Sequence, residues 1–137
     1  MINPEWNWVE FTEAPVRESC RDKIYASLNE RGDLLLNRKG YQALGRPEAV
    51  VLLVDLQRRA IGIRPAPPET VNALKVNKKG RFDNWIIHAW RFTKKYYMRI
   101  TGTVRFPTAR VEHGVLILEL KFRVPITYQP RPGRPHK

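Results

Sequence analysis

The stretch LNERGDLLL, residues 28–36, has a counterpart in VNKKGRFDN, residues 76–84, and this pair decides how the chain is organised. Aligning their two asparagines also brings Gly32 onto Gly80. A glycine accepts the positive φ that tight turns between strands require, so each stretch predicts a turn in a hairpin. The two turns differ in charge, because NERGD is balanced whereas KKGR is wholly basic.

The residues around the first turn predict the order strand, turn, strand, short helix, strand, turn, strand. LLL continues the hairpin, and Asn37 can cap a short helix that ends at Gly45. AVVLLVD is a run typical of a buried strand, and AIGIRP alternates Ile61 with Ile63. Residues 65–70 form a proline-rich connector in which we expect neither helix nor central strand.

The residues around the second turn repeat this order less regularly. LKVNKKGRF predicts a strand, a turn and the start of a strand. DNWIIHAWRFTKKYY predicts an apolar-periodic helix with Asp83 or Asn84 as its cap, and we expect it to begin early because FDNW interrupts the strand. MRITGTVRF and VLILELKFRV predict two more strands, joined by PTARVEHG.

The expected fold is α+β and mainly β, with two related halves that form one compact β-barrel-like body. We place a single domain in residues 23–128, with halves at 23–64 and 71–128 on either side of the connector. Residues 1–22, which include WNWVEF, are expected to form an N-terminal arm, and residues 129–137 a disordered basic tail.

Residues 29–63 resemble the swapped-hairpin DNA-binding domain of AbrB-like transition-state regulators and antitoxins. The matching features are the NERG turn, the LLL strand, a short helix closing on Leu44 and Gly45, a strand ending in Val54 and Asp55, and a strand with Ile61 and Ile63. The resemblance implies two interlocked copies, here within one chain, whose hairpins and helices direct basic residues at DNA. The family's arginine after the turn glycine is Asp33 in the first copy and Arg81 in the second. The pattern leaves open a homodimer in which the halves exchange between chains.

Positive charge is the main functional signal in the sequence. The net charge is +12, yet residues 1–70 hold ten Lys/Arg against ten Asp/Glu, whereas residues 71–137 hold fifteen against three. Such a field favours phosphate backbones, although it also serves solubility. The predicted nucleic-acid-binding residues are Lys75, Lys78, Lys79, Arg81, Arg91, Lys94, Lys95, Arg99 and Arg105.

Aromatic residues are interleaved with these cations. Exposed rings stack unpaired bases, and the candidates for such stacking are Trp85, Trp90, Tyr96 and Tyr97. The alternative is that both tryptophans, with Ile86, Ala89 and Phe92, form the apolar face of a core helix. These two interpretations assign the tryptophans to ligand binding or to packing.

Catalytic and metal-binding patterns find no support. His88, His113 and His136 have no metal-ligand spacing with Cys20 or with one another, and the chain has no glycine-rich phosphate loop. We therefore predict no enzymatic activity, no cofactor and no small-molecule ligand. No apolar run approaches the ~20 residues that cross a bilayer, and a single cysteine suits a cytoplasmic protein, so we expect no membrane association.

The predicted function is non-enzymatic nucleic-acid binding by the basic second half, with DNA preferred to RNA because of the family resemblance. One alternative is binding of single-stranded DNA or RNA by aromatic stacking. Another is a protein-interaction or structural module without a nucleic-acid ligand, in which the first half and the WNWVEF arm meet a partner.

Overall fold

The computed structural model describes residues 7, 9 and 23–126, so most of the expected arm and all of the expected tail lie outside the described residues. The described part is α+β and mainly β, as the sequence predicts. Its two helices are short. They are α1 (Arg38–Ala43) and α2 (Trp90–Lys95).

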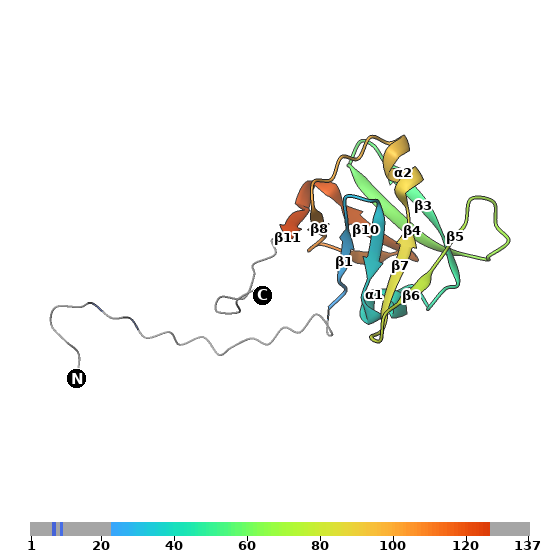
Figure 1. Ribbon diagram of the computed structural model, residues 1–137, viewed down its shortest axis with the longest axis horizontal. Helices are drawn as coiled ribbons and strands as arrows, with labels where there is room; N and C mark the ends of the chain where they lie inside the picture. The colour runs from blue at the N-terminus through green and yellow to red at the C-terminus, as the bar shows by residue number, and fades with distance from the viewer. Residues whose placement is uncertain (1–6, 8, 10–22, 127–137) are drawn as a thin grey trace, which may run out of the picture.

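The strands form two antiparallel sheets (Figure 1). In spatial order, the six-stranded sheet contains β11 (Val124–Ile126), β8 (Thr103–Arg105), β1 (Ala26–Leu28), β2 (Asp33–Leu36), β7 (Asn84–His88) and β6 (Asn77–Lys79). The five-stranded sheet contains β5 (Leu74–Lys75), β3 (Ala49–Asp55), β4 (Ala60–Ala66), β10 (Val115–Glu119) and β9 (Arg110–Glu112). Within the described residues the two sheets do not join into a closed barrel.

Both sheets combine hairpins from the two halves of the chain. In the six-stranded sheet, β2 pairs with β7 and places Leu35 opposite Ile86. In the five-stranded sheet, β4 pairs with β10 and places Gly62 opposite Ile117. In each case the second strand of one half's hairpin pairs antiparallel with the second strand of the other half's hairpin. This reciprocal pairing is what a local two-fold relation between two halves produces.

The core fills the space between the sheets. Apolar residues alternate along the strands, so that Ile61 and Ile63 of β4 and Leu116 and Leu118 of β10 all point inward. Burial of each such side chain contributes about 1.5–3 kcal/mol before entropy is counted. The largest fully buried side chains are Phe106, Leu28, Leu34, Leu36, Ile61, Ile63, Ile87, Leu116, Leu118 and Val50.

The first half follows its predicted order, and Asn37 holds it together. The Asn37 side-chain oxygen accepts hydrogen bonds from the backbone N–H groups of Gly40 and Tyr25, both at 2.9 Å. Its amide nitrogen donates to the Lys23 carbonyl at 2.7 Å. The predicted cap of α1 is therefore confirmed, and it also ties the helix to the chain entering β1.

The predicted helix in DNWIIHAWRFTKKYY is wrong over its first part. Residues 84–88 form β7 between β2 and β6, and the helix begins only at Trp90. Ile86 and Ile87 are β-branched, and the backbone groups of β2 provide a partner that the periodicity of a single segment does not reveal. FDNW does not start a helix either, because residues 80–83 are the β6–β7 turn.

This correction also shifts the alignment of the two halves. The β1–β2 turn occupies residues 29–32, whereas the β6–β7 turn occupies residues 80–83. Gly32 therefore ends the first turn, while Gly80 begins the second. Superposing the two glycines, as the sequence suggests, is wrong by three residues, and Asn77 lies within β6.

The remaining differences concern strand limits. MRITGTVRF forms a strand only over β8, PTARVEHG contains β9, and VLILELKFRV divides into β10, the 3₁₀ turn η1 (Leu120–Phe122) and β11. LKVNKK divides between β5 and β6, which belong to different sheets. Pro65, expected in a connector, lies in β4 opposite Val50, beyond the residues that pair with β10. A proline is tolerated at this position because β10 does not pair with β4 at Pro65, so one side of the strand needs no N–H donor there.

Candidate nucleic-acid interface

Each hairpin turn lies against the helix of the other half. The β1–β2 turn contacts the start of α2, where the backbone N–H of Ala89 donates to the Gly32 carbonyl at 2.8 Å. A Cβ atom on Gly32 would stand 2.5 Å from the Cα of Trp90. The β6–β7 turn lies beside α1, at the opposite end of the molecule from α2 (Figure 1).

Aromatic and ionic contacts fix the β6–β7 turn on α1. The indole of Trp85 stacks on the ring of Tyr41, with centroids 4.0 Å apart and an interplanar angle of 21°. The guanidinium of Arg46 lies 5.0 Å from the Tyr41 centroid, and its Nη1 is 3.5 Å from Oδ2 of Asp83. Asp83 also accepts a hydrogen bond from the Trp85 indole. The basic turn of the second half is thus joined to the helix of the first.

This junction collects exposed cations from both halves, and we call it the turn–α1 face. The elements that meet here carry six exposed cations: Arg38, Lys39 and Arg46 of the first half and Lys78, Lys79 and Arg81 of the second. Lys78 lies opposite Trp85 and shares its face of the sheet, whereas Lys79 lies opposite Asn84 and lines a hollow with Ile86 on the other face. Phe82 at the tip of the turn is 71% exposed. Sequence reasoning missed the three cations of the first half, because that half is neutral as a sum. The signal was present in the arginine and lysine that directly follow the Asn37 cap.

Asp83 is the carboxylate of the turn itself. The hydrogen bond from Trp85 is the main reason that the pKa of Asp83 lies below its usual value, and Arg46 and Arg38 lower it further. Asp83 therefore stays ionised and engaged within the junction. Its ionic partner is Arg46.

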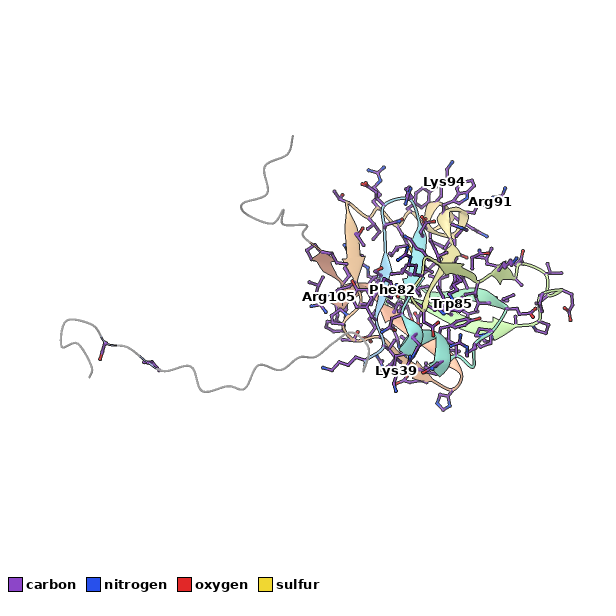
Figure 2. The ribbon with its side chains drawn as sticks, turned by 60° about the horizontal axis from the view of Figure 1, so that its bottom comes forward. Lys39, Phe82, Trp85, Arg91, Lys94 and Arg105 are labelled. Carbon is purple, nitrogen blue, oxygen red and sulfur yellow. The ribbon has the colours of Figure 1, made fainter. Side chains whose placement is uncertain are left out.

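The nine predicted cations are all exposed, but the structure does not bring them together. Lys78, Lys79 and Arg81 belong to the turn–α1 face. The others are distributed over α2 (Arg91, Lys94 and Lys95), the segment after it (Arg99), β8 (Arg105) and β5 of the other sheet (Lys75). Figure 2 shows the labelled Arg91 and Lys94 on the side opposite Lys39, with Arg105 at a third position.

The four predicted stacking residues differ in exposure. Trp85 is half-buried against Tyr41, which explains it by packing, although on a strand and not on the expected core helix. Tyr96 is half-buried and meets Phe92 edge-on at 5.1 Å between centroids. Trp90 is 49% exposed and Tyr97 is 87% exposed, so these two rings are accessible.

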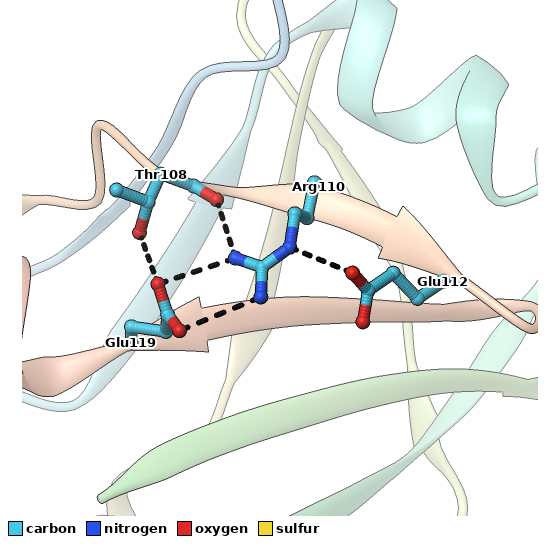
Figure 3. Close-up of polar contacts among 4 residues, drawn as sticks. All are labelled: Thr108, Arg110, Glu112 and Glu119. Carbon is cyan, nitrogen blue, oxygen red and sulfur yellow. Dashed lines mark hydrogen bonds and ion pairs between the residues drawn. The ribbon is translucent and has the colours of Figure 1, made fainter. Parts of the chain in front are cut away.

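Two other acids of the second half are occupied away from the turn–α1 face. Figure 3 shows Arg110 between two carboxylates: its Nε donates to Glu112 at 3.0 Å, and its Nη1 and Nη2 donate to Glu119 at 3.2 and 3.4 Å. Glu119 also accepts a hydrogen bond from the Thr108 hydroxyl at 2.8 Å. The hydrogen bonds from Arg110, then that from Thr108, hold the pKa of Glu119 below its usual value.

A side-chain hydrogen bond links the two halves at the β2–β7 pairing. Nδ1 of His88 is 2.9 Å from Oδ1 of Asp33, and the Asn29 amide donates to the same carboxylate at 3.2 Å. The hydrogen bond with His88 is the largest cause of the lowered pKa of Asp33. Asp33 is part of the hydrogen-bond network of the first hairpin and is not part of the turn–α1 face.

Neither a metal-binding cluster nor a membrane-spanning helix occurs among the described residues. Residues 7, 9 and 23–126 contain no group of three or more His, Cys, Asp or Glu placed to hold a metal ion. In the same part of the chain, no helix has the length and apolar character needed to cross a membrane. No protein-family model, curated protein or solved structure matches the chain.

Proposed function

We propose that this protein is a non-enzymatic nucleic-acid-binding protein that contacts duplex DNA with its turn–α1 face. The observation that carries the proposal is that two elements joined by the Trp85–Tyr41 contact, the β6–β7 hairpin and α1 with the residues just after it, carry six exposed cations from distant parts of the sequence. Lysine and arginine at such a face contact phosphates and release counterions from the duplex. Asp83, the acid of the turn, is engaged by Arg46 and Trp85.

The contacts that hold the β6–β7 turn against α1 support this proposal. The stacking of Trp85 on Tyr41 and the Arg46–Asp83 pair fix the backbone of the turn before any ligand arrives. A surface that is already ordered loses less conformational entropy on binding. Lys78, Lys79 and Arg81 are thus presented on a supported hairpin.

The AbrB-like resemblance assigns DNA contact to the residue after the turn glycine. Arg81 follows Gly80 in sequence, but Gly80 begins its turn whereas Gly32 ends the first, so Arg81 does not occupy the place of Asp33. The guanidinium of an arginine can also read the O6 and N7 acceptors of a guanine in the major groove. The preference for duplex DNA over RNA rests on this resemblance. A cytoplasmic location is part of the same proposal, since the lone Cys20 offers no partner for an intrachain disulfide.

The test compares two triple variants of the full chain. The first variant replaces Lys78, Lys79 and Arg81 with Gln. The matched control replaces Arg91, Lys94 and Lys95 of α2 with Gln. We expect the first to lose about 10²-fold in affinity for a labelled 20-base-pair duplex at low salt, since each lost phosphate contact weakens binding in a sequence-independent way. We expect the control to lose less than fivefold.

Two results would contradict the proposal. One is no detectable duplex binding by the wild-type chain at low salt. The other is a larger loss in the α2 variant than in the turn variant, which would move the interface to the opposite end of the molecule.

A further inference from the structure

A second cationic surface lies between the β3–β4 turn, the segment that follows α2, and η1. It lines a hollow of about 510 Å³, which continues into a neighbouring hollow of about 420 Å³. Three arginines and two apolar residues line both hollows, so we treat them as one groove. The groove's cations are Arg59, Arg99, Arg123 and, in the larger hollow, Lys121, and we call it the four-cation groove.

Hydrogen bonds join the segments that form the groove. The N–H of Leu120 donates to the Arg59 carbonyl at 2.9 Å, which ties η1 to the β3–β4 turn. Nη1 of Arg123 donates to the Leu120 carbonyl at 3.0 Å. Leu120 itself is buried in the core. The cations therefore project from a supported frame.

The groove is lined by more cations than carboxylates. Asp55 is the one carboxylate among the described residues that line it, and its Oδ1 accepts a hydrogen bond from the Arg58 backbone at 3.0 Å. Within residues 23–126, the side chains of Arg59, Arg99 and Lys121 form no ion pair with a carboxylate within 4.0 Å. Four cations that converge on one hollow repel one another, and an anion relieves this repulsion.

The walls of the groove also include apolar and aromatic groups. Ile100 and Leu120 line both hollows, and Tyr97, which is 87% exposed, lines the smaller one. A nucleotide needs both features, because its phosphate requires cations and its base stacks on an aromatic ring. In a duplex the bases are already stacked, so an exposed ring beside a cationic groove is better used by an unpaired strand.

We propose that the four-cation groove binds a segment of single-stranded nucleic acid, with phosphates on the four cations and an unpaired base on Tyr97. This site lies away from the turn–α1 face and does not depend on the duplex function proposed above. It assigns the accessible ring of Tyr97 to a ligand and leaves Trp85 to packing.

The test uses the full chain with Arg59, Arg99 and Lys121 each replaced by Gln. Arg123 is kept because it supports η1 through the Leu120 carbonyl. The probe is a fluorescein-labelled ten-residue oligo-dT, measured by anisotropy at several salt concentrations. We expect affinity to fall at least tenfold at low salt, and the slope of log affinity against log salt to become shallower by about 2, from about 0.7 per lost contact on a single strand.

Two matched variants separate the parts of the groove. Tyr97→Ala is expected to weaken oligo-dT binding about tenfold without changing the salt slope, because stacking releases no counterions. The triple variant of Lys78, Lys79 and Arg81 is expected to bind oligo-dT within threefold of the wild type. That variant loses duplex binding instead, so failure of the duplex proposal and failure of the groove are distinguishable.

The proposal is overturned if the groove variant binds oligo-dT within twofold of the wild type while it remains folded. It is also overturned if a deca-glutamate peptide binds the wild type more tightly than oligo-dT and loses affinity in the groove variant, since the ligand is then an acidic protein segment. If the triple variant does not fold, Arg99→Gln alone serves as the test. Its expected loss is about threefold, with a salt slope shallower by about 0.7.

Discussion

The two hairpin turns occupy related places in the fold, yet they differ in how tightly they are packed. The β1–β2 turn is closed: Gly32 is buried with φ of 90°, and the Asn29 side chain accepts hydrogen bonds from the N–H groups of Arg31 and Asp33. The β6–β7 turn is open: Gly80 is exposed with φ of 72°, and nothing lies within 4 Å of where its Cβ would be. Both turns meet the helix of the other half and both carry exposed charged residues, but only the glycine of the first turn is packed tightly against its neighbours.

The largest expected effect on stability is that of Gly32→Ala, and the same substitution at Gly80 is its matched control. Gly32→Ala places a Cβ 2.5 Å from the Trp90 backbone in addition to the strain of a positive φ. We expect a loss of about 3 kcal/mol in the free energy of unfolding, measured in urea. Gly80→Ala meets only the φ strain and should cost about 1 kcal/mol. Equal losses would show that the first turn is not the tighter one.

The asparagines that the sequence aligns give the next effect. Asn29→Ala removes a side chain that bonds two backbone N–H groups and the Asp33 carboxylate, and we expect a loss of about 2 kcal/mol. Asn77 lies within β6 and not at a turn. The matched Asn77→Ala is expected to cost less than about 1 kcal/mol, the span of strand propensity. A larger loss for Asn77→Ala than for Asn29→Ala would contradict the assignment of Asn29 to a turn and of Asn77 to a strand.

A smaller effect concerns pH and the first turn. The pKa of Asp33 is lowered in the folded protein, chiefly by its hydrogen bond with His88. Such a carboxylate stabilises the fold above its unfolded pKa of about 4, and this contribution is lost as pH falls through the lower folded value. Asp33→Asn should therefore be less stable than the wild type at pH 7 by a fraction of about 1 kcal/mol, because an exposed pair is screened. The difference should shrink as the pH is lowered below the unfolded pKa and the carboxylate becomes protonated; a difference that stays constant with pH would assign the effect to something other than charge.

The first hairpin, the Asn37 cap and the order of elements in the first half follow from the sequence because each depends on residues close in the chain. β7 does not, since Ile86 and Ile87 suit a strand or a helix until the backbone of β2 is present beside them. The candidate site was predicted in part for the same reason. Lys78, Lys79 and Arg81 are close in sequence, whereas the position of their hairpin beside α1, which carries Arg38 and Lys39, depends on the contact between Trp85 and Tyr41.

The smallest expected effect on stability belongs to the open turn and accompanies the largest effect on binding. Replacing Lys78, Lys79 and Arg81 by Gln removes three exposed side chains. We expect the melting temperature to change by no more than about 3 °C, because surface substitutions usually stay within about 0.5 kcal/mol. A large fall in melting temperature would show that this turn is structural, like the first.

The most direct measurement is the affinity of the wild type and this triple variant for a 20-base-pair duplex between 50 and 300 mM salt. If the open turn contacts phosphates, the slope of log affinity against log salt becomes shallower in the variant by about 2.7, which is about 0.9 for each lost contact. The same slope and the same affinity in both proteins would contradict the claim that the open turn is the nucleic-acid-binding surface.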